Sequence, residues 1–341
     1  MEKKMKILII GPAWIGDMVM TQTLLNLLKQ RHPNSEIDVF APAWTKPLLD
    51  HMSEVHESLD SPFGHSELRL GDRYRLGILF RERHYEQAII LSNSYKSALI
   101  PYFARIPRRI GWIGEMRYGL LNDIRWLNKK HLPQMIQRIM ILGLKKGEPL
   151  PIKLPYPQLQ ISASSVDTTL NRLSLSKKDT PILALCPGAE FGPSKQWPMN
   201  YYADIARAKL SEGWRVWLFG SMKDKAITDS ITALTKHQAE NLAGVTKLSE
   251  AVDLLSLASL VITNDSGLMH IAAALSRPMV VIYGSTSSKF TPPLSKKSKI
   301  LRSTLQCSPC FKRTCPYGHY NCMRELKPKQ ILEAATTILS S

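Results

Sequence analysis

The segment LVITNDSGLMHIAAAL, residues 260–275, indicates the fold of the chain. It opens with a short apolar run, Leu260 to Thr263, which is typical of a buried parallel strand. The stretch from Leu268 to Leu275 has the apolar character of a packed helix. Between them lies a polar turn, Asn264 to Gly267. A strand, a tight polar turn and a helix make up the repeating unit of α/β domains.

The same alternation recurs along the rest of the chain. It predicts an α/β protein with two Rossmann-like, doubly wound domains that face each other across a cleft. Ligands are expected beyond the carboxyl ends of the strands. Strands are expected at residues 6–11, 37–41, 88–91, 182–186, 216–219 and 280–283, and helices at 18–28, 201–210, 248–257 and 328–339.

Length and composition divide the chain. Its 341 residues exceed the usual size of one domain. A proline cluster and a polar run separate the two halves. We expect an N-terminal domain over residues 1–155, a linker over 156–178 and a C-terminal domain over 179–325. A closing helix within 326–341 is expected to pack back on the N-terminal domain.

The chain is strongly basic, with 45 Lys and Arg against 28 Asp and Glu and a net charge of +17. Residues 69–146 alone hold 16 basic and 5 acidic side chains. This excess indicates a polyanionic partner, either nucleic acid, an anionic membrane surface or a phosphorylated substrate. A solvated basic surface without a specific partner is the alternative. No signal-peptide core and no transmembrane stretch is visible, so we expect a cytoplasmic protein, soluble or peripheral.

A glycine-containing loop opens the C-terminal domain with the sequence PGAEFGPSKQWP, residues 187–198. Gly188 lets a phosphate approach the backbone, Ser194 offers a hydroxyl and Lys195 a point charge. The loop therefore suits a phosphate, although it is not a Walker A motif and an ordinary strand–helix loop remains an alternative. In the next such turn, FGSMKD, Gly220 is followed by Asp224, a weak candidate for binding ribose hydroxyls.

The polar turn of the opening segment is the strongest local signal. Ser266 and Gly267 would present N–H groups at a helix N-terminus, where a diphosphate is stabilised. Asp265 is suited to accept hydrogen bonds from sugar hydroxyls. His270 lies one turn further on, so it can face the same site. A capped helix with a buried histidine is the structural alternative.

The first strand of the chain ends in GPAWIGD, residues 11–17. This string lacks the three glycines of a dinucleotide fingerprint. It places Gly16 in a tight turn and Asp17 at the start of a helix. Asp17 is either a helix cap or a general base at the mouth of a cleft, and the residues alone leave both open.

Four of the five cysteines, Cys307, Cys310, Cys315 and Cys322, lie within sixteen residues. Four thiolates would suit a tetrahedral structural zinc ion. The spacing departs from paired C-x2-C motifs, and reduced thiols that pack a loop are the alternative.

These motifs together resemble one family over nearly the whole chain. The strings GPAWIGDMVM, PGAEFGPSKQWP, FGSMKD and NDSGLMHIAAALSRPMVVIYGSTS occur in this order. They resemble the ADP-heptose:lipopolysaccharide heptosyltransferases, family 9 glycosyltransferases of the two-domain GT-B fold. The strings NSYKSALIP and GEMRYGLLND are most similar to the branch that adds the second heptose of the inner core.

The resemblance implies an inverting, metal-independent transfer of L-glycero-D-manno-heptose from ADP-heptose to heptosyl-Kdo2-lipid A. Asp17 would be the general base, and Lys195 would stabilise the diphosphate. The C-terminal domain would bind the nucleotide sugar, with Thr246 near the adenine. The N-terminal domain would bind the acceptor, and the enzyme would lie at the cytoplasmic face of the inner membrane, with no nucleic acid as partner. The expected acceptor-binding residues are Gly16, Asn93, Lys96 and Arg117.

Other functions compete with this interpretation. Heptosyltransferase I or another family 9 enzyme would share the short motifs. Two Rossmann-like halves also suit an NAD-dependent dehydrogenase, although the missing G-x-G-x-x-G motif argues against it. The high net charge suits a nucleic-acid-binding protein, and a sugar-nucleotide sensor would bind the donor without turnover.

Overall fold

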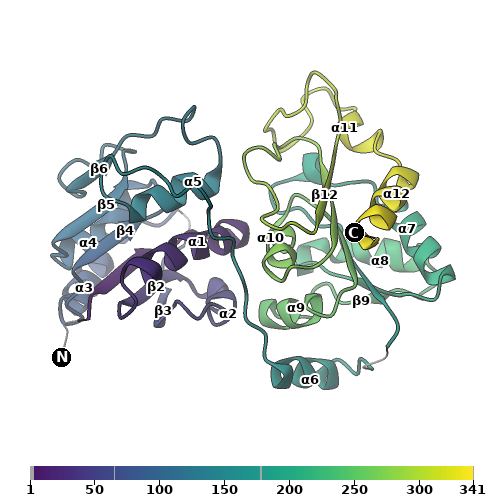
Figure 1. The fold of residues 1–341 in the computed structure, drawn as a ribbon, viewed down its shortest axis with the longest axis horizontal. Coiled ribbons are helices and arrows are strands. Elements are labelled where there is room, and N and C mark those ends of the chain that lie inside the picture. Colours follow the sequence, from purple (N-terminus) through teal and green to yellow (C-terminus); the bar gives the residue numbers. More distant parts are fainter. Residues whose placement is uncertain (1–3, 65, 177–178, 341) are drawn as a thin grey trace. The chain divides into compact units, whose positions relative to one another are not determined.

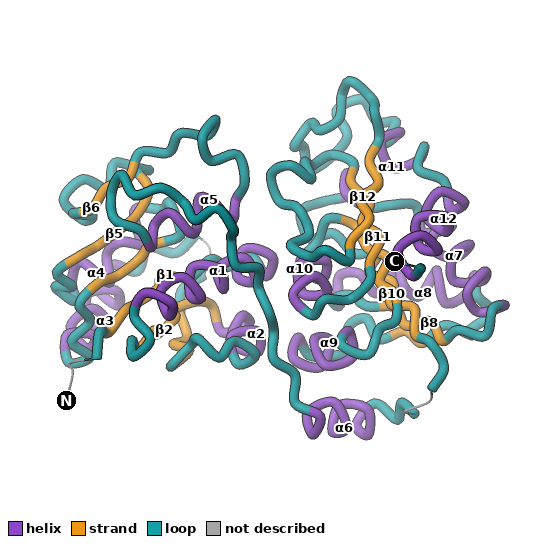
Figure 2. The backbone as a smooth tube through the Cα atoms, viewed as in Figure 1, coloured by secondary structure: helices purple, strands orange, loops and turns teal. Residues whose placement is uncertain are grey.

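The computed structural model describes residues 4–64, 66–176 and 179–340. The chain divides after Pro157 into two compact units, where the sequence placed the end of the first domain at residue 155. Each unit is a parallel six-stranded sheet with helices on both faces (Figures 1 and 2). The predicted class, two Rossmann-like α/β domains, is therefore confirmed. In the described ranges, no helix is both long enough and apolar enough to cross a membrane.

The first unit has the strand order β3-β2-β1-β4-β5-β6. Helices α3 and α4 pack together over one face, and α1 and α5 over the other. Leu8 and Ile10 of β1 point into the core beneath α3 and α4. The strands are β1 (Lys6–Ile10), β2 (Glu36–Pro42), β3 (Glu57–Ser61), β4 (Gln87–Ile90), β5 (Arg108–Trp112) and β6 (Asp123–Arg125); the helices are α1 (Ile15–Arg31), α2 (Lys46–Leu49), α3 (Leu70–Arg81), α4 (Leu99–Phe103) and α5 (Met135–Met140), with 3-10 turns η1 (Ala43–Thr45), η2 (Tyr95–Ala98) and η3 (Ile141–Gly143).

The second unit has the order β12-β11-β10-β7-β8-β9. Helices α7, α8 and α12 cover one face, whereas α9 and α10 belong to the other. The strands are β7 (Ile182–Cys186), β8 (Arg215–Leu218), β9 (Glu240–Asn241), β10 (Leu260–Asn264), β11 (Met279–Tyr283) and β12 (Ser298–Arg302); the helices are α6 (Ala163–Arg172), α7 (Met199–Ser211), α8 (Lys225–Leu234), α9 (Leu248–Leu255), α10 (Gly267–Ala274), α11 (Asn321–Arg324) and α12 (Pro328–Leu339), with 3-10 turns η4 (Pro193–Lys195) and η5 (Met222–Asp224).

Both ends of this unit pack within it. The closing helix α12, which the sequence predicted to pack on the N-terminal domain, contacts α7, β11 and β12, and its Ile331 and Ala335 complete the second core. Much of the expected linker is the helix α6. Its Ser165 and Thr169 donate hydrogen bonds to Asp253 of α9, so this segment docks on the second unit.

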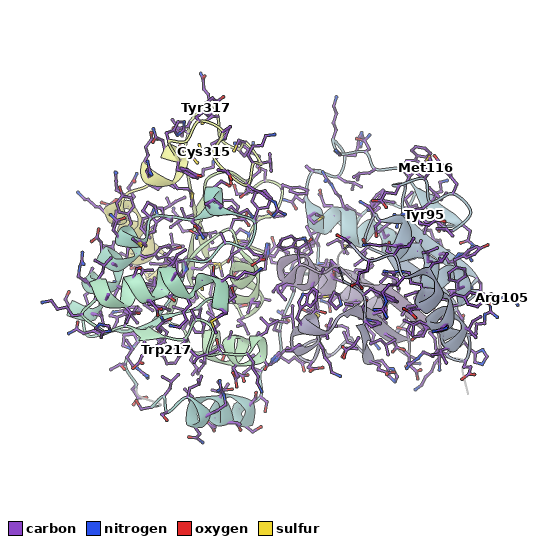
Figure 3. The ribbon with its side chains drawn as sticks, turned by 180° about the vertical axis from the view of Figure 1, so that it is seen from behind. Tyr95, Arg105, Met116, Trp217, Cys315 and Tyr317 are labelled. Carbon is purple, nitrogen blue, oxygen red and sulfur yellow. The ribbon has the colours of Figure 1, made fainter. Side chains whose placement is uncertain are left out.

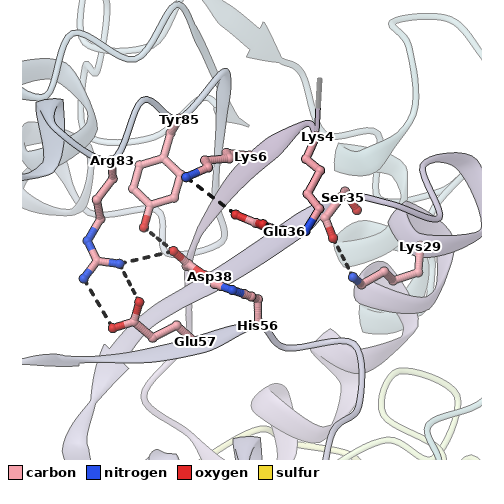
Figure 4. A network of polar contacts seen from close by, with 10 residues as sticks. All are labelled: Lys4, Lys6, Lys29, Ser35, Glu36, Asp38, His56, Glu57, Arg83 and Tyr85. Carbon is pink, nitrogen blue, oxygen red and sulfur yellow. Dashed lines mark hydrogen bonds and ion pairs between the residues drawn. The ribbon is translucent and has the colours of Figure 1, made fainter. Parts of the chain in front are cut away.

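A polar network ties together the amino ends of the first sheet (Figure 4). The Asp38 carboxylate on β2 accepts hydrogen bonds from the Tyr85 hydroxyl, at 2.6 Å, and lies 2.9 Å from His56 Nδ1. Arg83 pairs with Glu57 at 2.6 Å, which lowers the pKa of that carboxyl. Asp38, His56 and Glu57 lie close enough to hold a cation. Because Arg83 already neutralises Glu57, the network connects β2, β3 and the turn before β4 without requiring a metal ion.

Candidate active site

The second sheet reverses its direction of growth at β7. The chain runs outward from β7 to β8 and β9, and then returns to place β10 on the other side of β7. A crevice forms at such a switch point, beyond the carboxyl ends of the two strands. The loops after β7, β8, β10 and β11 carry the motifs that the sequence singled out, so the fold brings these motifs to one edge of the sheet.

Asn264 holds the two sides of this switch point together. Its side chain is fully buried at the end of β10. The amide donates to the Pro187 carbonyl at 2.8 Å and accepts hydrogen bonds from the Tyr202 hydroxyl, at 2.9 Å, and the Trp197 N–H, at 3.3 Å. One side chain therefore sets the position of the loop after β7 relative to β10.

Lys195 and Asp265 form a buried ion pair beside Asn264. The Lys195 ammonium lies 2.7 Å from Asp265 Oδ2, and the two side chains are 15% and 6% exposed. The Thr286 hydroxyl, from the loop after β11, donates to the same carboxylate oxygen at 2.5 Å. Three loops therefore meet at one carboxylate. The cost of burying both charges is offset by their attraction and by this additional hydrogen bond.

His270 lies in the second turn of α10, buried near the ion pair. Burial lowers the pKa of His270 to about 4, whereas the nearby Asp265 charge raises this pKa and the Lys195 charge lowers it by a smaller amount. The imidazole is therefore neutral at neutral pH. With the lysine compensated by Asp265, the three side chains together carry no net charge.

The first turn of α10 follows directly after Asp265. Ser266 is the N-cap residue, and its hydroxyl accepts a hydrogen bond from the Met269 N–H at 3.4 Å. Gly267 is the first helical residue. The unpaired N–H groups of a helix start carry partial positive charge, which favours an anion.

Asp224 occupies the space that two glycines leave open. A Cβ atom on Gly188 would lie 2.5 Å from the Asp224 carboxyl carbon, and one on Gly220 would lie 2.8 Å from its Cβ. The carboxylate accepts hydrogen bonds from Ser221 through Oδ2, at 2.8 Å. Both glycines are thus required for the loops to close around Asp224. Thr246 lies in the loop after β9, where its hydroxyl donates to the Leu242 carbonyl at 3.0 Å.

Ser194 has a different environment from the one predicted. It is buried, and its hydroxyl donates to the Lys312 carbonyl and bonds Ser285 Oγ at 2.9 Å. Its N–H donates to the Arg313 carbonyl at 3.1 Å. Lys312 and Arg313 lie on the loop after β12 and Ser285 lies after β11, so Ser194 anchors both segments to the loop after β7.

In the first unit, Gly16 and Asp17 lie in the first turn of α1. The N-cap residue is Trp14, without a side-chain cap, so Asp17 stands at the third helical position and is partly buried. A carboxylate there interacts favourably with the helix dipole. Asp17 thus follows β1 at its carboxyl end, as the sequence predicts.

Arg117 does not present its guanidinium to an acceptor. The side chain is completely buried, and this burial lowers the pKa of Arg117 to about 10. It donates to the Ser92 carbonyl at 2.7 Å, to Asn93 Oδ1 at 3.4 Å and to the Trp112 carbonyl. Arg117 therefore supports the loop after β4 that carries Asn93 and Lys96.

Much of the basic stretch over residues 69–146 also points inward. Arg109 donates to the Leu120 and Ile106 carbonyls, and both Arg108 and Arg125 pair with Asp123. Arg105, in contrast, projects from the surface (Figure 3). Part of the positive charge therefore belongs to arginines that donate hydrogen bonds to backbone carbonyl groups within the unit. Composition alone could not show this role.

The four clustered cysteines lie on and beyond the loop after β12, with Cys315 near its tip (Figure 3). Backbone N–H groups, Tyr320 foremost and then Tyr317, Gly318 and His319, lower the pKa of the Cys315 thiol. All five thiols are free. Across the described ranges, no three of these sulfur atoms lie within 4.8 Å of one another.

Comparison with known proteins places this geometry in a family. The sequence model of glycosyltransferase family 9 (heptosyltransferase) matches residues 73–321.

The chain belongs to glycosyltransferase family 9.

It is 46% identical to "Lipopolysaccharide heptosyltransferase 2" of Escherichia coli (strain K12), over 98% of this chain and 99% of that protein. It is 44% identical to "Lipooligosaccharide heptosyltransferase 2" of Haemophilus influenzae, over 98% and 100% of the two chains. The solved structure of E. coli ADP-heptose lps heptosyltransferase II superposes with a TM-score of 0.89 at 44% identity, covering 98% of this chain and 99% of that one. The resemblance predicted from the motifs is confirmed, and the chain is a glycosyltransferase.

For this family 9 enzyme, the sequence motifs missed three residues of the site. Asn264 is the first residue of the motif NDSG, but an asparagine at this position does not by itself indicate that its side chain connects two loops. Thr286 and Ser285 follow β11 in the string YGSTS, and a polar turn after a buried strand was the available signal.

We predict that Asn264→Ala destabilises the second unit by about 3 kcal/mol, because the Pro187 carbonyl, the Trp197 N–H and the Tyr202 hydroxyl lose their partner inside the core. Urea unfolding followed by tryptophan fluorescence measures this change. The matched control is Asn200→Ala, an exposed asparagine on α7, for which the change should stay within about 0.5 kcal/mol. Equal unfolding curves for the two variants would show that Asn264 does not hold the loops.

Proposed function

We propose that this glycosyltransferase moves L-glycero-D-manno-heptose from ADP-heptose to the first heptose of the lipopolysaccharide inner core, heptosyl-Kdo2-lipid A. The observation that carries the proposal is the similarity, over nearly the full length of both chains, to proteins named heptosyltransferase 2. The polar switch-point site of the second unit supports it, because it combines a lysine, a carboxylate and a helix N-terminus in the form that a sugar diphosphate requires.

The transfer proceeds with inversion. Asp17 accepts the proton of the acceptor hydroxyl as its oxygen attacks the anomeric carbon of the donor heptose. The bond from that carbon to the ADP oxygen breaks on the opposite face, and its electron pair leaves with ADP. A carboxylate in the first turn of α1, after the carboxyl end of β1, supports this assignment.

The leaving group is stabilised by the chain itself. As the glycosidic bond breaks, negative charge grows on the diphosphate. Lys195 and the N–H groups at Ser266 and Gly267 supply the compensating positive charge, so the step is metal-independent. The diphosphate draws the Lys195 ammonium away from Asp265, and the released carboxylate accepts hydrogen bonds from the heptose hydroxyls. Asp224 serves the ribose and Thr246 the adenine, while Gly188, Gly220 and the neutral His270 shape the same pocket.

The acceptor is assigned to the first unit, at Gly16 and at the Asn93–Lys96 loop that Arg117 supports. Lipid A with Kdo is anionic and embedded in a membrane. Exposed cations such as Arg105, Lys129 and Lys130 suit a peripheral position at the cytoplasmic face of the inner membrane, with no nucleic acid as partner.

A transfer assay with ADP-heptose and acceptors that carry zero or one heptose tests the function. We expect product only with the one-heptose acceptor. Product with the zero-heptose acceptor alone would assign heptosyltransferase I activity. Donor binding without any product would indicate a sugar-nucleotide sensor, and salt-sensitive RNA or DNA binding that ADP-heptose does not displace would indicate a nucleic-acid-binding protein.

In the same assay, Asp17→Asn should lower kcat at least ~100-fold, because general base catalysis contributes about 10²- to 10⁴-fold. Its affinity for ADP, measured by calorimetry, should equal that of the native enzyme. The exposed Asp60→Asn, also in the first unit, is the control and should keep full activity. A kcat for Asp17→Asn within a few-fold of the native value would remove Asp17 from the base role.

The cysteine cluster is proposed to hold a structural zinc ion, separate from the transfer. Four soft sulfur donors fit zinc, and the N–H groups that surround Cys315 suit a metal thiolate. The loop would need to contract for all four sulfurs to reach one ion.

Protein purified without chelators should therefore contain about one zinc per chain by elemental analysis, and a Cys310→Ser, Cys315→Ser variant should contain none. A zinc content near zero in the native protein would leave only the packing role for these thiols.

A further inference from the structure

The resting donor site has no net positive charge to offer a diphosphate. Lys195 is compensated by Asp265 at 2.7 Å, and His270 is neutral because burial lowers its pKa to about 4. A sugar-nucleotide diphosphate is a dianion, and it must leave water to enter this crevice. A second cation beside Lys195 would therefore favour its binding.

Arg313 borders the same loop as Lys195 and is therefore the candidate for that cation. Its guanidinium carbon lies 5.6 Å from the centre of the Phe191 ring, and the Lys195 ammonium lies 5.0 Å from the same centre. Phe191 belongs to the loop after β7, so both cations border this loop. Within the described part of the chain, the Arg313 guanidinium makes no hydrogen bond or ion pair, and the side chain is exposed.

The backbone of Arg313 is fixed by hydrogen bonding, whereas its guanidinium lies over the Phe191 ring. The Arg313 carbonyl accepts a hydrogen bond from the Ser194 N–H, at 3.1 Å, one residue before Lys195. The contact is close enough that a Cβ atom on Gly192 would lie 2.6 Å from this carbonyl oxygen. The peptide of Arg313 thus lies directly against the loop that carries Lys195.

Further bonds hold the same loop against the end of β11. The Phe311 N–H donates to the Ser285 carbonyl at 2.7 Å, and the Ser308 hydroxyl donates to the Gly284 carbonyl at 2.7 Å. Ser285 immediately precedes Thr286, which bonds Asp265. The loop after β12 is therefore hydrogen-bonded to the loops after β7 and β11, which hold the ion pair. It carries the guanidinium of Arg313 next to them.

We propose that Arg313 is a second cationic residue of the donor site and binds the diphosphate of the nucleotide sugar. The inference deepens the proposed function and rests on it. Arginine suits this task because its planar fork can donate two hydrogen bonds to phosphate oxygens. Lys195, in contrast, must first leave Asp265. Arg313 supplies the uncompensated charge that attracts the dianion, and Lys195 follows when the diphosphate displaces it from Asp265.

The test compares ADP with adenosine, which lacks the phosphates. Binding of both is measured by calorimetry or by competition for native enzyme, Arg313→Ala, Arg313→Lys and the charge-matched control Lys299→Ala. Lys299 is exposed on β12. We expect Arg313→Ala to weaken ADP binding ~10- to 100-fold, since hydrogen bonds to charged groups contribute on this scale. Adenosine binding should not change. Arg313→Lys should show a smaller loss, and Lys299→Ala none.

Kinetics add a second readout. The KM for ADP-heptose should rise in Arg313→Ala by a factor similar to the loss in ADP affinity.

Two results would overturn the inference. The first is an ADP affinity of Arg313→Ala equal to that of Lys299→Ala. The second is an equal loss of ADP and adenosine affinity, which would show a displaced loop instead of a lost phosphate contact. Failure of the proposed function is a separate outcome, because the native enzyme would then bind no ADP or transfer no heptose.

Discussion

The buried pair of Lys195 and Asp265 is the interaction on which the candidate site depends. Two opposite charges in a crevice are stable only when both remain paired and hydrogen-bonded. The surrounding structure meets this condition with Thr286 on the carboxylate and with Asn264, which fixes the loop that carries the lysine. The same pairing makes the resting site neutral. In the proposed function, the incoming diphosphate competes with Asp265 for the lysine, and this exchange couples binding of the diphosphate to release of a carboxylate that holds the sugar.

Three loops from distant parts of the sequence surround this pair. The loop after β7 brings Lys195, the loop after β11 brings Ser285 and Thr286, and the loop after β12 closes over both through Ser308, Phe311 and the carbonyls of residues 312 and 313. Ser194 is the point where all three meet. A serine is suited to this position, because its small hydroxyl can make several hydrogen bonds. The three backbone segments approach too closely for a larger side chain.

The sequence predicted the parts of the fold that are signalled locally. Apolar runs such as Ile182 to Cys186 indicated the central strands, because parallel strands are buried on both faces. The edge strands β3 and β12, with sequences ESLDS and SKILR, carry no such run and were missed. Helix α3 was missed for a related reason, since arginines interrupt its apolar positions. The locations of Asp17, Lys195 and Asp265 after strand ends followed from the α/β pattern. The burial of Arg117 and the anchoring role of Ser194 did not, because both depend on partners that are distant in sequence.

The exchange of Lys195 between Asp265 and the diphosphate is tested by the affinity for ADP of Lys195→Ala, Asp265→Asn and the double variant. If the lysine must leave Asp265 to reach the diphosphate, Lys195→Ala should weaken ADP binding and Asp265→Asn should strengthen it, because the amide no longer competes for the ammonium. In the Lys195→Ala background, the part of this strengthening that comes from competition for the ammonium should disappear, which leaves only the relief of repulsion between the carboxylate and the diphosphate. An Asp265→Asn variant that binds ADP as weakly as Lys195→Ala would rule out this exchange, since the carboxylate would then support nucleotide binding instead of competing with it.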